Sequence, residues 1–170
     1  MNEQITSDQI ASVDVAAQRI VSIRDRFAES AIPSFVGSAF GELYGFLADR
    51  GIEPAGPPLV VYHEFGTEID AEVAVPIPDG PALATDTPDA GRVRLAMLPA
   101  ARVAQTLHVG PYDRLGMAYD RLGHWIEDHG YVPAAPTRER YLNGPDTAAP
   151  DDLQTVIEMP IVEAATLAAR

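Results

Sequence analysis

The chain has 170 residues, of which 46% are hydrophobic and 22% charged, a composition typical of globular domains. Its 25 acidic and 12 basic residues give a formal net charge of -13, and a surface of that sign repels the phosphates of nucleic acids and of anionic membranes. The lack of cysteine excludes disulfides and thiolate nucleophiles, and no apolar run approaches the roughly 20 residues that span a bilayer. We therefore expect a cytoplasmic protein with neither a nucleic-acid nor a membrane partner.

The first half of the chain predicts a strand, a helix and a strand pair. Residues Val13 to Arg24 are rich in β-branched and apolar side chains, which favours a strand. Residues Phe35 to Arg50 place apolar side chains at helical spacing, and Gly51 follows where helices often end in a left-handed residue. Two short apolar runs, Leu59 to His63 and Asp70 to Val75, predict the strand pair.

The same order of elements returns after a linker. Residues Pro78 to Gly91 are rich in Pro, Asp, Ala and Gly, which is typical of a connection between structural units. The predicted elements of the second half are a strand over Arg92 to His108, a helix over Tyr112 to His129, and strands over Glu139 to Leu142 and Leu153 to Glu158. A polar hairpin loop, Pro145 to Asp152, accounts for the extra length of this half.

The two halves are copies of one unit. A shift of 79 residues brings nine pairs into one register: Leu43 with Leu122, Phe46 with Trp125, Leu47 with Ile126, Asp49 with Asp128, Gly51 with Gly130, Pro54 with Pro133, Ala55 with Ala134, Pro57 with Pro136 and Tyr62 with Tyr141. Each unit alone would bury little apolar surface. We therefore expect an α+β fold in which duplicated β-α-β-β units form one antiparallel sheet with two helices packed on it.

The second half carries the motifs of a known family. The run from His108 to Tyr112 before the helix, the run from Arg138 to Leu142, and the closing Met159-Pro160-Ile161 resemble the DNA gyrase inhibitor-like (GyrI-like) small-molecule-binding domains. The resemblance implies a ligand groove at the pseudo-two-fold axis between the repeats, lined by aromatic side chains and a carboxylate. Such domains also occur as effector-binding domains of multidrug-sensing transcription regulators.

The resemblance also sets the expected boundaries. It covers residues 13–163 as a single domain, made of repeats at about 13–78 and 91–163, after an N-terminal segment over 1–12. Because that segment is too short for a DNA-binding module, we expect a stand-alone member. A homodimer and a protein partner are alternatives that the sequence leaves open.

Two glutamates are candidates for the groove carboxylate. The resemblance implies a pocket glutamate four residues before the proline of a closing strand, a place that Val156 holds in the second half and Glu72 in the first. Glu158 lies two residues beyond Val156 and therefore on the same strand face. We predict that Glu72 or Glu158 presents a carboxylate to the groove, where it binds a cation or acts as a general acid or base, with exposure to solvent as the alternative.

Aromatic residues supply the other candidates. Tyr62 and Tyr141 occupy equivalent strand positions, and we predict that their rings line the groove and stack on a planar ligand or hold a cation, with Tyr141 also a catalytic candidate. Tyr112 joins them on the strength of the resemblance. Three aromatic residues on the helices complete the predicted ligand contacts, with core packing the stronger alternative: Phe40, Tyr119 and Trp125.

We expect neither a metal nor a cofactor. The four histidines show no metal-binding spacing, and His108 is instead predicted to fix the following Gly-Pro-Tyr turn by a hydrogen bond. Glycine-rich phosphate loops and nucleophile elbows are also missing from the sequence.

The sequence is compatible with three competing functions. The first is a binding protein that captures lipophilic, planar, neutral or cationic small-molecule ligands and so confers resistance to drugs or toxins. The alternative is a hydrolase of electrophilic small molecules, such as cyclopropane-containing DNA alkylators, that uses a pocket glutamate and tyrosine. The third, an inhibitor that mimics DNA by its acidity, is disfavoured because no acidic run concentrates the charge on one element.

Overall fold

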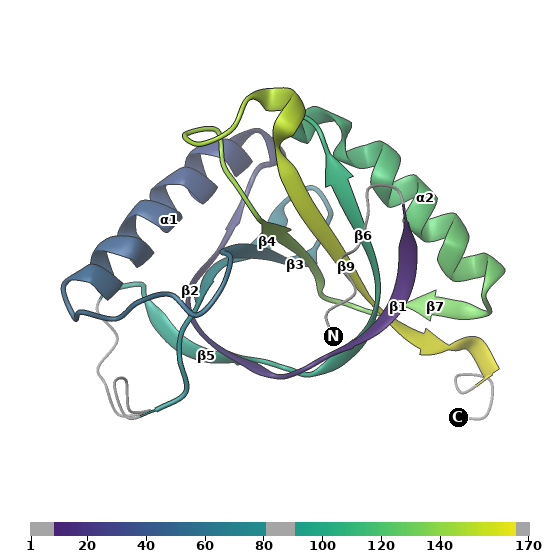
Figure 1. Cartoon of the computed structure of the whole chain (residues 1–170), viewed down its shortest axis with the longest axis horizontal. Helices are drawn as coiled ribbons and strands as arrows, with labels where there is room; N and C mark the ends of the chain where they lie inside the picture. The colour runs from purple at the N-terminus through teal and green to yellow at the C-terminus, as the bar shows by residue number, and fades with distance from the viewer. Residues whose placement is uncertain (1–8, 81–90, 166–170) are drawn as a thin grey trace. The chain divides into compact units, whose positions relative to one another are not determined.

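The computed structural model describes residues 9–80 and 91–165. Its contacts divide the chain into two compact units, one made of Ala16–Ala100 and the other of Met1–Val15 with Ala101–Arg170. Each unit contains an antiparallel sheet and one long helix packed across it (Figure 1). The predicted α+β class and the strand-helix-strand-strand order of both halves are confirmed.

The Ala16–Ala100 unit, called the first unit, has strands in the order β3-β4-β2-β5. In chain order its elements are β2 (Gln18–Phe27), the 3-10 turn η1 (Glu29–Ala31), α1 (Ile32–Ala48), β3 (Leu59–Glu64), β4 (Ile69–Pro76) and β5 (Arg94–Leu98). The ring of Phe35 on α1 lies 4.3 Å from that of Phe27 on β2. Because strand side chains alternate, α1 therefore covers the face of β2 that also holds Val21 and Ile23.

The second unit has strands in the order β1-β6-β9-β8, with a short strand β7 paired to the end of β9. Its elements are β1 (Ile10–Val15), β6 (Ala101–Val109), η2 (Tyr112–Arg114), α2 (Leu115–Asp128), β7 (Tyr131–Pro133), β8 (Thr137–Tyr141), η3 (Pro150–Asp152) and β9 (Gln154–Glu163). One buried cluster joins helix and sheet, because Ala118, Leu122 and Ile126 of α2 pack with Ala104 and Ile157.

Each long strand that opens a repeat was predicted as one element and is two. The first breaks at Ala16-Ala17 and the second at Pro99-Ala100. The cause is a change of partner, since β1 pairs with β6 whereas β2 pairs with β4 and β5. Pro99 also has no N–H with which to continue a ladder.

Both helices end as predicted. Gly51 and Gly130 have φ of 63° and 73°, the left-handed values that glycine adopts without steric cost. After α1, the N–H of Ile52 donates to the carbonyl of Leu47 at 3.0 Å and that of Gly51 to Ala48 at 3.1 Å, the two hydrogen bonds of a Schellman motif. The helix boundaries differ by a few residues, because α1 begins at Ile32 and the 3-10 turn η2 precedes α2.

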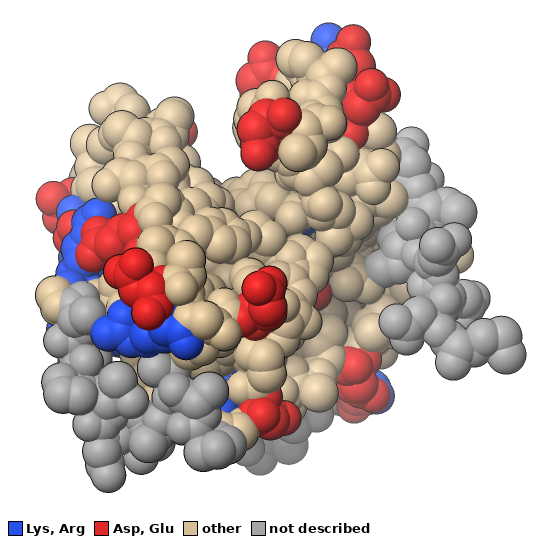
Figure 2. Space-filling view, turned by 60° about the vertical axis from the view of Figure 1, so that its left-hand side comes forward, with Lys and Arg blue, Asp and Glu red and all other residues tan. Residues whose placement is uncertain are grey.

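The described residues form no helix that is long and apolar enough to cross a membrane. The acidic side chains visible in Figure 2 lie in separate patches, with fewer basic ones among them. This scatter agrees with a sequence whose negative charge is not concentrated on one element.

Candidate functional site

The second unit contains a buried carboxylate, Glu139, which the sequence interpretation did not select. Glu139 lies on β8, is 5% exposed, and accepts hydrogen bonds from two tyrosine hydroxyls. Tyr119 Oη donates to Glu139 Oε1 at 2.6 Å, and Tyr141 Oη donates to Glu139 Oε2 at 2.8 Å. Both carboxylate oxygens are thus held by side-chain donors from a helix and a strand.

The register of the sheet explains this position. Glu139 pairs with Ile157 of β9, whose side chain belongs to the core beneath α2. Side chains of directly paired residues point to the same face of a sheet, so Glu139 points toward α2. Tyr119 lies on α2 about one turn after the helix begins, and its hydroxyl contacts Glu139 from the helix side.

Burial controls the ionisation of this carboxyl group. Desolvation raises the pKa of Glu139, because the charged form loses its hydration. The hydrogen bonds from Tyr119 and Tyr141 and the nearby His108 act in the opposite direction without cancelling the effect. The geometry therefore suits a carboxyl group that accepts a proton more readily than an exposed glutamate does.

Tyr112 forms the solvent-exposed side of the same group. It is 39% exposed, and its ring lies edge-on to that of Tyr141 at 5.7 Å. Burial first, and then the negative charges of Glu139 and Asp146, raise the pKa of Tyr112. The turn that places this ring is fixed as predicted, since His108 Nε2 donates to the carbonyl of Pro111 at 3.1 Å.

The first unit lacks the carboxylate at the equivalent position. The shift of 79 residues that aligns the repeats places Val60 opposite Glu139 and Phe40 opposite Tyr119. Val60 is buried on β3, as Glu139 is on β8. This replacement of valine by glutamate at a repeat position was the sequence signal that could have identified Glu139.

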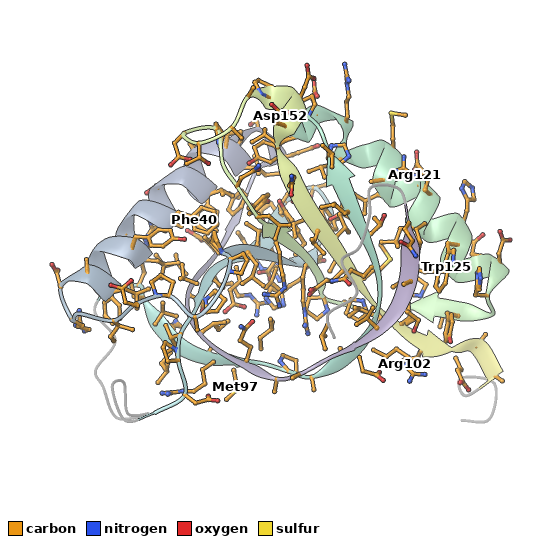
Figure 3. The ribbon with its side chains drawn as sticks, in the orientation of Figure 1. Phe40, Met97, Arg102, Arg121, Trp125 and Asp152 are labelled. Carbon is orange, nitrogen blue, oxygen red and sulfur yellow. The ribbon has the colours of Figure 1, made fainter. Side chains whose placement is uncertain are left out.

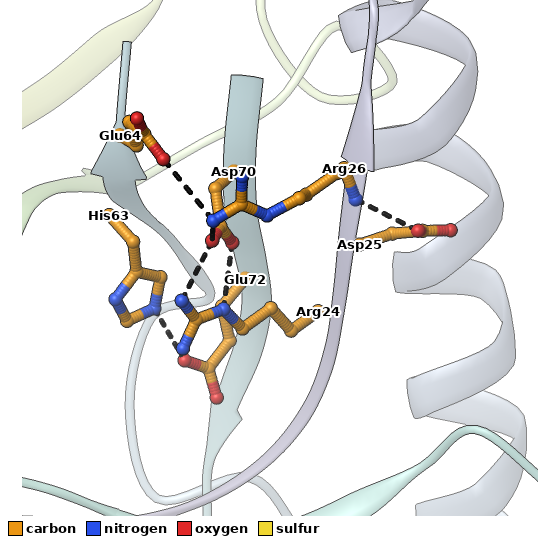
Figure 4. A network of polar contacts seen from close by, with 7 residues as sticks. All are labelled: Arg24, Asp25, Arg26, His63, Glu64, Asp70 and Glu72. Atoms are coloured by element: carbon orange, nitrogen blue, oxygen red, sulfur yellow. Dashed lines mark hydrogen bonds and ion pairs between the residues drawn. The ribbon is translucent and has the colours of Figure 1, made fainter. Parts of the chain in front are cut away.

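Glu72, the predicted groove carboxylate of the first unit, is ion-paired. His63 Nε2 donates to Glu72 Oε2 at 2.9 Å, and both side chains are largely buried (Figure 4). Glu72 pairs in register with Arg24 of β2, on the face opposite to that covered by α1. Glu72 therefore faces away from the helix of its unit, whereas Glu139 faces toward the helix of the other.

The same face holds a larger charge network. Arg24 binds the buried Asp70 in a bidentate pair at 2.7 and 2.8 Å, and Arg26 contacts Asp70 at 3.0 Å and Glu64 at 3.2 Å (Figure 4). The hydrogen bond from Arg24 is the main reason that the pKa of Asp70 lies below its usual value. Each acid in the network has a cationic or histidine partner.

Glu158, the other predicted carboxylate, lies on the face of its sheet opposite to Glu139. It is 2% exposed and pairs in register with Arg138. Arg140 Nε donates to Glu158 Oε1 at 2.8 Å, and Arg138 contributes a longer ion pair at 4.0 Å. Burial lowers the pKa of Arg138, and the charge of Glu158 opposes that shift.

The remaining predicted aromatic contacts are spread over both units. Tyr62 is buried and stacks on Phe65 at 4.9 Å, while Phe40 lies half-buried on α1 (Figure 3). Trp125 stacks on His129 at 4.0 Å and packs against the core cluster, about 9 Å along α2 from Tyr119. Of the eight predicted ligand-binding residues, the structure thus brings together Tyr112, Tyr119 and Tyr141, around the unpredicted Glu139. Among the described residues, no three His, Asp or Glu side chains are close enough to hold a metal ion.

Comparison with solved structures supports the fold. EcmrR bound to DNA has 22% identity and a TM-score of 0.78, with alignment over 91% of this chain and 57% of that one. A hydrolase from Listeria innocua gives 15% identity and a TM-score of 0.67 over 94% of each chain. SAV2435, solved with tetraphenylphosphonium, gives 17% identity and a TM-score of 0.64 over 91% of this chain and 94% of that one.

Sequence comparison gives the family. No curated protein matches the chain. The chain spans little more than half the length of EcmrR, although it covers 98% of the separate EcmrR C-terminal domain at a TM-score of 0.72. The family model for the GyrI-like small-molecule-binding domain matches residues 8–162. With nearly its whole length in that match, the chain belongs to the GyrI-like small-molecule-binding domain family.

Proposed function

We propose that this protein captures lipophilic, planar compounds, neutral or cationic, at Glu139 and the surrounding tyrosines. One observation carries the proposal: Glu139 is a buried carboxylate whose hydrogen bonds come from neutral hydroxyls. Within the described part of the chain, no arginine or lysine forms an ion pair with it, whereas Glu72 and Glu158 each have a charged or histidine partner. A ligand cation would therefore stabilise the ionised form of Glu139, which no arginine of the described chain does.

The side chains around Glu139 suit such a ligand. The rings of Tyr112, Tyr119 and Tyr141 offer faces and edges that attract organic cations and stack on aromatic systems. Tyr112 is exposed and Glu139 is not, so a lipophilic molecule would meet the rings before the carboxylate. The tetraphenylphosphonium held by SAV2435 is lipophilic and cationic but tetrahedral, so it supports by similarity the cationic part of the proposal and not the planar part. Capture of a toxic compound in this way would lower its free concentration and confer resistance.

Binding of three probes tests the proposal. Isothermal titration with tetraphenylphosphonium, a planar N-methylacridinium cation and neutral anthracene measures how affinity depends on charge and shape. We expect Glu139→Gln to reduce the affinity for the two cations at least tenfold and the affinity for anthracene much less, since only the cations lose a charge interaction. Glu72→Gln, which removes an ion-paired carboxylate of the first unit, is the matched control. Equal affinities for wild type and Glu139→Gln would show that Glu139 does not bind the ligand.

Hydrolysis of an electrophilic compound is the second candidate, and the raised pKa of Glu139 favours it. In this scheme Glu139 takes a proton from water while the water oxygen bonds to a cyclopropane carbon. The ring C–C bond breaks, its electron pair moves to a conjugated carbonyl oxygen, and that oxygen takes a proton from Tyr119 or Tyr141. The proton on Glu139 then returns to the tyrosine.

Turnover separates hydrolysis from capture. Incubation with excess cyclopropane-containing alkylator, followed by chromatography, should give more than one equivalent of ring-opened product if the protein is an enzyme. Glu72→Gln and Glu158→Gln test the two carboxylates predicted from the sequence, beside Glu139→Gln and Tyr141→Phe. Binding without product would leave capture as the function.

A further inference from the structure

Thr155 is a buried polar residue beside the Glu139 group. It lies on β9 with 0% exposure, and its Oγ1 has no hydrogen-bond partner among the residues that the structure describes. A buried hydroxyl without a partner is destabilising, because it loses its bonds to water and gains none. Such groups are rare in folded proteins, so the presence of one calls for a physical reason.

The register places Thr155 next to residues of the candidate site. It pairs with Tyr141 of β8 on one side and with His108 of β6 on the other. All three side chains therefore point to the α2 face, where Tyr141 donates its hydrogen bond to Glu139. Glu139 is the diagonal neighbour of Thr155, at a separation of about 7–8 Å.

The first unit shows that the fold does not need a hydroxyl at this place. The alignment of Pro76 with Pro160 sets Ala71 of β4 opposite Thr155, and Ala71 is likewise fully buried and paired with a tyrosine, Tyr62. An apolar side chain at this position is thus compatible with the same strand arrangement. Thr155 therefore belongs to the set of polar residues that distinguish the second unit from the first.

We infer, on the basis of the proposed function, that Thr155 determines ligand specificity. Its hydroxyl forms a hydrogen bond with a polar atom of the molecule bound at Glu139, and it serves as donor or acceptor. The expected ligands are therefore lipophilic compounds that carry a hydroxyl, carbonyl or amide group several ångströms from the part of the molecule that binds Glu139. Because Thr155 is fully covered, such a ligand reaches it when a neighbouring side chain such as the half-exposed Tyr141 turns aside.

Probes that differ by one hydroxyl test this inference. Isothermal titration compares tetraphenylphosphonium with its 3- and 4-hydroxyphenyl analogues, which have the same charge and nearly the same shape. We expect Thr155→Val to reduce the affinity for at least one hydroxylated analogue about 2- to 12-fold, which corresponds to the loss of one hydrogen bond. The affinity for tetraphenylphosphonium should stay unchanged. Thr155→Ser keeps the hydroxyl and should retain the affinity of wild type.

The outcomes separate this inference from the proposed function. Equal binding of all three probes by wild type and Thr155→Val, with weakened binding by Glu139→Gln, overturns the role of Thr155 alone. An equal loss for tetraphenylphosphonium and its analogues also overturns it, since that result indicates a change in packing. If no probe binds to wild type, or if Glu139→Gln binds every probe as wild type does, both proposals are wrong. Thermal unfolding gives a second readout, because Thr155→Val should be no less stable than wild type; a lower Tm would mean that the hydroxyl has a partner within the protein.

Discussion

Replacement of Tyr119 by phenylalanine tests whether the hydrogen bonds to Glu139 stabilise the second unit. A hydrogen bond to a charged acceptor contributes about 1.5–3 kcal/mol, so Tyr119→Phe should lower the free energy of unfolding by about 2 kcal/mol. For a chain of 150 to 250 residues, that loss lowers Tm by roughly 4–8 °C. Far-UV circular dichroism during heating at pH 7 measures the change.

The same substitution in a Glu139→Val variant isolates the interaction between Tyr119 and Glu139. Glu139→Val copies Val60 of the first unit, and in that background Tyr119→Phe loses no bond to a carboxylate, so its cost should fall below about 0.5 kcal/mol. Tyr131→Phe is the matched control, because no hydrogen bond joins Tyr131 to Glu139. An equal cost of Tyr119→Phe in the two backgrounds would contradict the coupling between the tyrosine and the carboxylate.

Four further substitutions test two buried acids and the helix α1. Asp70→Asn should lower the free energy of unfolding, measured by urea denaturation, by about 1–3 kcal/mol at pH 7 and by less at pH 3. The pKa of Asp70 is lowered in the folded protein, so this carboxylate contributes stability above its unfolded pKa of about 3.9. That contribution is lost as the folded group becomes protonated. For Glu139 the pH dependence of stability has the opposite sign, because the pKa of this group is raised in the folded protein. The stability that it contributes should fall as pH rises above the unfolded pKa of about 4.3. In thermal melts, Glu139→Gln should flatten that slope between pH 4 and pH 7. Gly51→Ala should lower stability by about 1–2 kcal/mol because φ is 63°, whereas Gly41→Ala, exposed within α1, should raise it by up to about 1 kcal/mol.

The order of elements could be predicted because it depends on local patterns. Apolar spacing identified both helices, and Gly51 and Gly130 marked their ends, since these signals arise within a few residues of chain. The breaks within the opening strands could not be found in this way. They depend on which distant strand pairs with each segment, and an apolar run does not encode its partner.

The candidate site was harder to predict for a related reason. Glu72 was selected by its distance from a proline, and Glu158 because it shares a strand face with Val156. The arginines and the histidine beside these two acids come from neighbouring strands. Glu139 was missed because only the pairing of β8 with β9 shows that it faces α2 rather than the opposite side. Its partners Tyr119 and Tyr141 were predicted as ligand contacts because they are aromatic residues of the predicted helix and strand, not because of Glu139.

The difference between the repeats argues that the polar residues of the second unit serve binding. At three aligned positions the first unit has Val60, Phe40 and Ala71 where the second has Glu139, Tyr119 and Thr155. The apolar set fits the same elements, so folding does not require the polar one, and a buried carboxylate and an unpaired hydroxyl each reduce stability. Residues that weaken a fold and are not needed to form it are expected where a protein meets its ligand. We therefore propose that the ligand chemistry lies at Glu139, Tyr119 and Thr155 rather than at Glu72 and Glu158.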